Sequence, residues 1–231
     1  MNTGGMMRRY KKKELKRDEF KETIQNLIIF YEHHKQPAIW IIMGILIVII
    51  VTFSFRNHAR TKFKQARKEY NIGVVVYNSG DFDQAQQQFE MVKNNFWGTS
   101  FAHRSTFMLA NIYYNKGQID KALQNFQDFV EGDYDELFTP GAYEGIAKCY
   151  EQKGDLTQSL EYYQKALDKF KYNTFKTDCL MHMGRIYLGM QWIDKAENIY
   201  KEALNLTNNS TIRKQVERKL KTIEALKEIS G

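Results

Sequence analysis

The chain repeats itself every 37 residues, and this period constrains its fold more than any other feature of the sequence. Two columns of small residues keep the period: Gly73, Ala110, Ala147 and Gly184, and then Ala85, Ala122, Ser159 and Ala196. An aromatic column follows at Phe89, Phe126, Tyr163 and Tyr200. Small residues let two helices approach closely, and a ring at a fixed offset fills the space between neighbouring helix pairs. The pattern predicts an all-α stack of four helical hairpins.

Each repeat also carries a signal for the turn between its two helices. Three repeats carry a glycine at the same position, namely Gly80, Gly117 and Gly154. In the fourth repeat Gln191 stands at this position. Glycine ends a helix by adopting the left-handed conformation. Just after the turn, four residues again keep the period, and we expect them to N-cap the second helices: Asp83, Asp120, Thr157 and Asp194.

These columns resemble those of the tetratricopeptide repeat (TPR) family, whose units carry small, aromatic, glycine, alanine and aromatic positions in this order. The resemblance implies an α-solenoid of four repeats, at residues 66–102, 103–139, 140–176 and 177–213. The period exceeds the family's by three residues, which we place in the loops that join repeats. Residues 214–231 form a charged helix with one apolar side, which we expect to cap the stack.

A second feature concerns the surroundings of the chain. Residues 38–55 read AIWIIMGILIVIIVTFSF, eighteen residues without a charge. As a helix they span about 27 Å, close to the roughly 30 Å thickness of a bilayer core. A buried core helix and a cleaved signal peptide are the alternatives, but the run lacks a polar face and 37 residues precede it. We therefore predict a transmembrane helix, which Pro37 begins and a juxtamembrane linker at residues 56–65 follows.

The positive charge belongs to the flanks of this segment. The net charge is +7, yet residues 1–68 hold fifteen Lys and Arg against five Asp and Glu, and the remainder holds nineteen against twenty-two. A mildly acidic repeat region argues against nucleic-acid binding. Residues 1–37 are predicted to be a basic tail with an amphipathic helix, or else a solvated tail. Since a short basic tail is hard to translocate, we expect it in the cytoplasm.

The first helices of TPR repeats line a concave groove, and the resemblance implies which side chains face it here. The predicted partner-binding residues are Arg67, Tyr70, Tyr77, Arg104, Phe107, Asn111, Tyr114, Asn115, Lys148 and Arg185. The alternative is that several of these rings only pack between helices. No P-loop, GxGxxG, HExxH or nucleophile elbow occurs, so we expect neither catalysis nor a cofactor or metal.

The order of the segments suggests a more specific relationship. A basic tail, an amphipathic stretch, one anchor and a repeat array that opens with KEYNIGVVVYNSGDFDQAQQQF resemble YfgM-like bacterial inner-membrane proteins. The resemblance implies a periplasmic scaffold associated with the SecYEG translocon and a PpiD-like chaperone, handling exported proteins. A scaffold for cell division, motility or a flagellar collar, and a cytoplasm-facing adaptor, remain alternatives.

Overall fold

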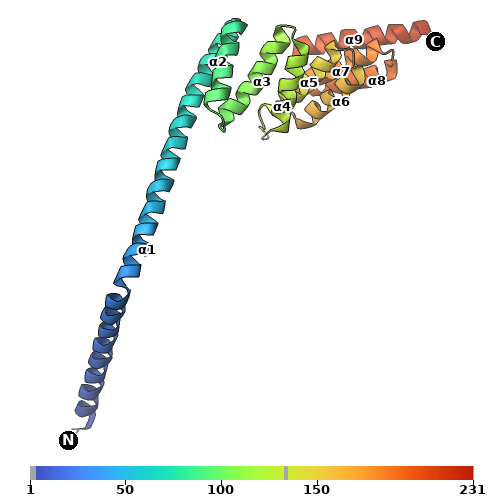
Figure 1. Cartoon of the computed structure of the whole chain (residues 1–231). Coiled ribbons are helices and arrows are strands. Elements are labelled where there is room, and N and C mark those ends of the chain that lie inside the picture. The colour runs from blue at the N-terminus through green and yellow to red at the C-terminus, as the bar shows by residue number, and fades with distance from the viewer. Residues whose placement is uncertain (1–3, 133–134, 231) are drawn as a thin grey trace. The chain divides into compact units, whose positions relative to one another are not determined.

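The computed structural model describes the backbone of residues 4–132 and 135–230, and these residues build an all-helical fold (Figure 1). The helices are α1 (Gly4–Asn78), α2 (Phe82–Asn95), α3 (Ser100–Asn115), α4 (Ile119–Glu131), α5 (Thr139–Gln152), α6 (Leu156–Lys169), α7 (Asn173–Gly189), α8 (Ile193–Leu206) and α9 (Ser210–Ser230). The prediction of an all-α solenoid is confirmed.

The chain divides into two compact parts, residues 1–60 and residues 61–231. In the first part α1 continues through Pro37, the residue expected to begin a separate helix. The residues expected to form a juxtamembrane linker, 56–65, are also helical and belong to α1. The boundaries of the tail, span and linker therefore stay predictions from charge and hydropathy, since no break in the helix marks them.

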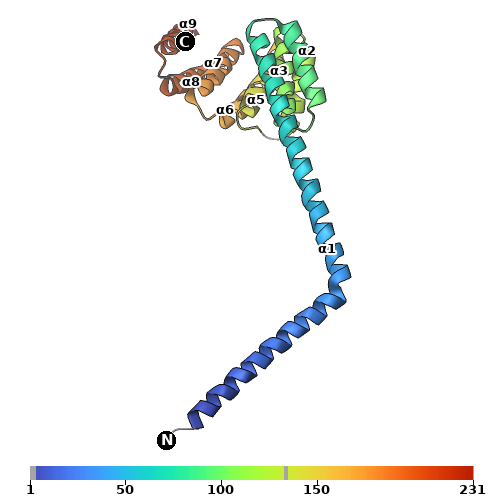
Figure 2. The same cartoon turned by 90° about the vertical axis from the view of Figure 1, so that its left-hand side faces the viewer.

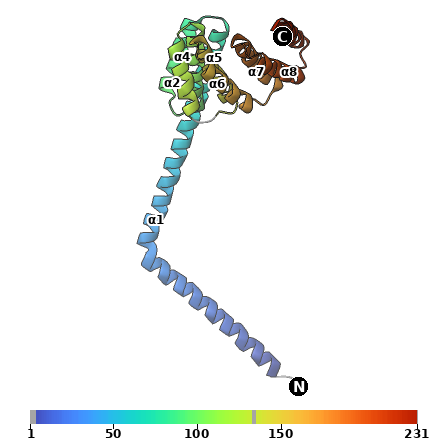
Figure 3. The same ribbon diagram turned by 90° about the vertical axis from the view of Figure 1, so that its right-hand side faces the viewer.

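The second part is a stack of antiparallel hairpins that ends in α9 (Figures 2 and 3). The predicted contact between small and aromatic columns is seen in the first and fourth hairpins. A methyl group added at Gly73 would lie 2.8 Å from the Phe89 ring, and one added at Gly184 would lie 2.7 Å from the Tyr200 ring. All four rings of the aromatic column are at most 1 % exposed. The small residues are therefore needed to admit the rings.

The turns within the hairpins share one backbone conformation. Gly80, Gly117 and Gly154 have φ values of 86°, 71° and 79°. Gln191 has a φ of 61°, so the fourth turn adopts the left-handed conformation without a glycine. A side chain in this region is strained, because its Cβ approaches the following carbonyl oxygen.

The predicted N-caps are wrong, because each second helix begins two residues earlier than expected. Asp81 caps α2 by accepting a hydrogen bond from the Gln84 amide at 3.0 Å, and Asp155 caps α6 through the Gln158 amide in the same way. α4 and α8 begin without a side-chain cap. The residues predicted as caps lie instead within the first helical turn.

Three of those residues join neighbouring repeats through ion pairs to lysines 33 residues later. The pairs are Asp83 with Lys116, Asp120 with Lys153 and Asp194 with Lys227. In the third repeat Thr157 replaces the aspartate and Met190 replaces the lysine, so both members of the pair are absent together. We call these contacts the Asp–Lys ladder. The aspartates of all three pairs are solvent-exposed, so water screens the charges and the pairs contribute little to stability.

The C-terminal helix α9 continues the repeat register. Its inward residues Val216, Leu220 and Ile223 stand 37 positions after Cys179, Met183 and Ile186, which are buried in α7. Val216 and Ile223 are fully buried in turn. α9 thus occupies the position of the first helix of a fifth repeat, and it covers the apolar side of the fourth hairpin as predicted.

The contact between Gly184 and Tyr200 gives a stability prediction. We expect Gly184→Ala to lower the free energy of unfolding by about 1–3 kcal/mol, since its methyl group overlaps a fully buried ring. The control is Gly189→Ala in the same helix, where a methyl group meets no atom within 4 Å. Circular-dichroism melting should show the loss only in Gly184→Ala; equal melting temperatures would contradict the packing account.

The left-handed turns give a second prediction. Gly154→Gln should lower the free energy of unfolding by about 1–2 kcal/mol, because glutamine resists a positive φ, although open space surrounds the position. The reciprocal Gln191→Gly should leave stability unchanged or raise it, since strain relief outweighs the added backbone freedom of the unfolded chain. Chemical denaturation of both variants checks this, and destabilisation by Gln191→Gly would refute it.

Candidate functional site

One predicted groove residue belongs to the core. Tyr70 is 7 % exposed, and its ring lies 5.5 Å from Phe89 and 5.4 Å from Phe101, centroid to centroid. Burial raises the pKa of its hydroxyl to about 12. The sequence left open that some of the groove rings only pack between helices, and this describes Tyr70. Its ring is therefore not accessible to a partner.

The predicted basic groove residues contact acids of the array itself. Arg104 Nε lies 2.7 Å from Asp135 Oδ2, and its guanidinium lies 4.9 Å from the centre of the Phe138 ring. Lys148 pairs with Glu144 one turn earlier at 2.5 Å. Arg185 reaches Glu151 of the preceding repeat at 2.6 Å. A ligand carboxylate would have to compete with these acids.

The remaining groove residues differ in their hydrogen bonds and in their exposure to solvent. The Asn111 amide donates to the Phe107 carbonyl within α3, and Asn115 donates to the Tyr77 hydroxyl across the first two repeats at 3.1 Å. Tyr114 is partly buried and Arg67 is exposed. Whether any of these residues binds a partner stays a prediction.

The third and fourth repeats hold ionisable groups near one another, and neighbouring residues partly shield them from water. Burial, followed by the positive charges of Lys148 and Arg185, lowers the pKa of His182. Its ring stacks on Tyr163 at 5.2 Å. Burial, followed by the negative charge of Glu144, raises the pKa of Asp178. This side of the groove is therefore densely charged and internally compensated.

An aromatic contact between neighbouring repeats occurs at two junctions and is absent from the third. Phe101 packs against Tyr70, and one period later Phe138 packs against Phe107 with ring centroids 5.2 Å apart. The next pair in register would join Phe175 to residue 144, but residue 144 is a glutamate. Phe175 consequently remains 47 % exposed, whereas Phe101 is 8 % exposed.

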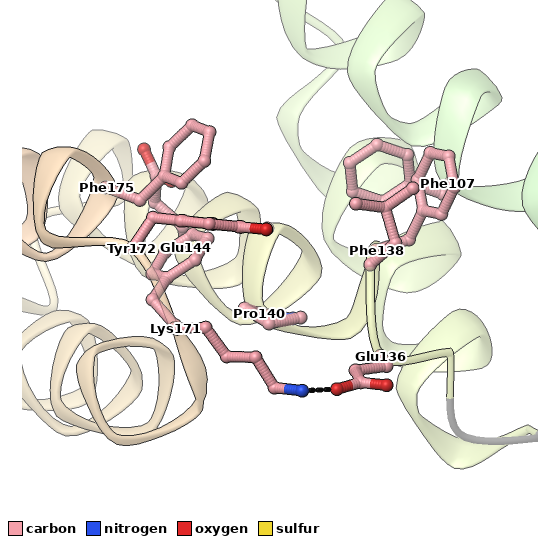
Figure 4. Close-up of a pocket in the computed structure, with 11 residues that line it drawn as sticks. Phe107, Glu136, Phe138, Pro140, Glu144, Lys171, Tyr172 and Phe175 are labelled. Carbon is pink, nitrogen blue, oxygen red and sulfur yellow. Dashed lines mark ion pairs between the residues drawn. The ribbon is translucent and has the colours of Figure 1, made fainter.

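An apolar hollow of about 620 Å³ opens where that contact is missing. We call it the junction pocket, and its lining residues are Phe107, Glu136, Leu137, Phe138, Pro140, Gly141, Glu144, Phe170, Lys171, Tyr172 and Phe175. Figure 4 shows Phe107 and Phe138 on one side, Tyr172 and Phe175 on the other, and Pro140 between them. The pocket is thus built from rings of successive repeats.

Exposed side chains surround the entrance of the junction pocket. Leu137 is 70 % and Tyr172 is 68 % exposed. An ion pair between Glu136 and Lys171 joins the two loops that flank the hollow (Figure 4). The wall is largely apolar with a carboxylate at Glu144, which suits an aliphatic or aromatic side chain of a partner.

Phe107, Gly141 and Glu144 of the junction pocket occupy groove positions of the first helices, and of these only Phe107 was predicted to bind. The other lining residues, which were not predicted, come from the loops that join repeats or from the first turn of the helix that follows. A signal for them exists, because Phe101, Phe138 and Phe175 form a further column with the same 37-residue period. Among the side chains that the structure describes, no group of three or more from His, Cys, Asp and Glu could hold a metal ion.

Comparison with known proteins identifies the family to which the chain belongs. The family model of the tetratricopeptide repeat-like domain matches residues 29–225, so the chain belongs to this family. The fold is that of protein–protein interaction scaffolds, and repeat folds of this kind are typically non-catalytic. A search of curated proteins finds no match.

Solved structures share the fold. A Podospora anserina kinesin light chain with nearly identical TPR-like repeats is 14 % identical, with a TM-score of 0.56 over 69 % of this chain and 85 % of that one. MamA from Desulfovibrio magneticus RS-1, residues 41 to the end, is 17 % identical, with a TM-score of 0.51 over 61 % and 75 %. A MamA RS-1 ArsTM double mutant is 18 % identical, with a TM-score of 0.52 over 64 % and 78 %. At these identities the likeness shows the fold alone.

The origin of the junction pocket gives a prediction. Glu144→Phe should restore the missing ring pair with Phe175 and raise the free energy of unfolding by about 0.5–1.5 kcal/mol. The control Glu144→Gln removes the pair with Lys148 but keeps the hollow, and it should change stability by no more than about 0.5 kcal/mol. Thermal melting compares the two; a less stable Glu144→Phe would show that the hollow does not accept a ring.

Proposed function

We propose that this chain is a single-pass membrane protein whose repeat array binds a segment of a partner protein in the junction pocket. The observation that carries the proposal is an open apolar hollow bordered by exposed Leu137, Tyr172 and Phe175. Exposed apolar surface of this kind marks binding sites in soluble domains, since leaving it in water is unfavourable. An apolar anchor of the partner would replace the contact that Glu144 removes from the repeat pattern.

The membrane part of the proposal is supported by the surface of α1. Every large hydrophobic side chain between residues 39 and 55 is at least 42 % exposed, and no part of this apolar stretch is buried against protein. A buried core helix is therefore a poor description. The Thr52 hydroxyl donates to the Val48 carbonyl at 2.8 Å, which satisfies it as a lipid environment requires.

We extend the proposal to a bacterial inner membrane, with the N-terminus in the cytoplasm and the repeats in the periplasm. The basic tail and the resemblance to YfgM-like proteins support this placement. By the same resemblance the partners would be SecYEG and a PpiD-like chaperone that handle exported proteins. Scaffolding of cell division, motility or a flagellar collar, or a cytoplasm-facing array, would use the same pocket with other partners.

Photocrosslinking in native membranes tests the pocket. A photoreactive amino acid at Tyr172 should yield discrete adducts, and one at Gln124 should not, because Gln124 is exposed on α4 outside the pocket. Leu137→Ser should reduce the Tyr172 adducts, since it removes an apolar part of the entrance. Circular dichroism of this variant confirms that it is folded.

The outcomes separate the parts of the proposal. The same adducts from Tyr172 and Gln124 would refute binding at the pocket. Adducts that contain division or motility components and lack Sec subunits and the chaperone would refute the translocon role while supporting the scaffold.

A further inference from the structure

The loop between the first two repeats holds a tryptophan in solvent. Trp97 is 80 % exposed, more than any other large hydrophobic side chain in the described part of the chain. The loop itself is ordered by local contacts: Gly98 has a φ of 79°, and Thr99 caps α3 through the Ala102 amide at 3.2 Å. An exposed ring on a fixed loop is a surface available for contact.

This loop is tied to the beginning of the repeat domain. The Lys62 ammonium donates to the Trp97 carbonyl oxygen at 2.7 Å, and the Phe63 ring lies 5.1 Å from Phe101, just after the loop. Phe63 is itself 45 % exposed. Trp97 thus lies beside the residues through which the domain joins the rest of α1.

The covalent chain limits how far Trp97 lies from the proposed membrane span. Lys62 follows Phe55, the last residue of that span, by seven positions. Seven residues cover at most about 25 Å when fully extended and about 10 Å as a helix. By chain length alone, the start of the repeat domain is therefore within reach of the bilayer that would hold the proposed span.

The composition of this end suits a lipid interface. Lys62 and Lys64 lie near the start of the domain, and Lys93 lies in the last turn of α2, immediately before the loop. Tryptophan favours the level of the lipid headgroups, where its ring is half in hydrocarbon and its N–H is hydrated. Lysines near the surface are attracted to anionic lipids.

We propose that Trp97 inserts into the membrane interface, with Lys62, Lys64 and Lys93 at the level of anionic headgroups. The repeat domain then contacts the bilayer at the junction of its first two repeats, apart from the junction pocket. The inference rests on the proposed membrane anchor and adds a second attachment point to it.

The three tryptophans of the chain provide the test, because each reports on a different place. Trp40 lies in the proposed span, Trp97 in the loop, and Trp192 at the start of α8, stacked on Tyr187 with ring centroids 5.8 Å apart. Full-length variants that keep one tryptophan and replace the other two by phenylalanine are placed in liposomes of phosphatidylcholine and phosphatidylglycerol. Fluorescence is then compared between brominated and unbrominated lipid.

We expect bromine to reduce the emission of Trp40 and Trp97 and to leave Trp192 unchanged. Equal emission losses for Trp97 and Trp192, with Trp40 quenched, would overturn the lipid contact while the anchor stands. An unquenched Trp40 would instead refute the anchor. In the Trp97 variant, Lys64→Glu with Lys93→Glu should reduce the quenching, and unchanged quenching would refute the role of the lysines. Because the liposomes hold no other protein, a contact with a partner protein gives no quenching and counts against the proposal.

Discussion

The structure depends on one close contact, in which a ring on the second helix of a repeat lies against a small residue on the first. At Gly184 the Tyr200 ring leaves no room for a methyl group. The same contact brings the aromatic column to the neighbouring repeat, where Tyr163 stacks on His182. Because one ring serves both contacts, the spacing within a hairpin also fixes the spacing between hairpins, and the stack follows from repetition.

The candidate site lies where the repetition fails. Two ring pairs, Tyr70 with Phe101 and Phe107 with Phe138, close the first two junctions between repeats. A single glutamate at residue 144 leaves Phe175 without its pair, and the junction pocket results. A repeat fold by itself does not specify a function. The departures from the period are therefore more informative about binding than the period itself.

The sequence predicted the features that follow from the spacing of residues along the chain. It did not predict the features that depend on which side chains surround a residue in the folded structure. It predicted the hairpins, the glycine turns and the terminal helix, because columns such as Gly73 with Phe89 record contacts that every repeat must make. It misplaced the caps, because Asp81 and Asp155 have no counterpart at Gln118 and Trp192 and so form no column. It placed Tyr70 in the groove, because a position within a helix does not reveal which neighbouring rings cover the side chain.

The junction between the third and fourth repeats has a mechanical consequence. Among the described residues it is the junction that has neither the ring pair nor a step of the Asp–Lys ladder, since Glu144, Thr157 and Met190 replace their members. In a solenoid, stiffness and cooperative unfolding depend on coupling between neighbours. At this junction the coupling therefore depends on the buried core that the third and fourth repeats share, in which Tyr163 and Leu180 lie. A segment bound in the junction pocket would contact both sides of this junction and would add to that coupling.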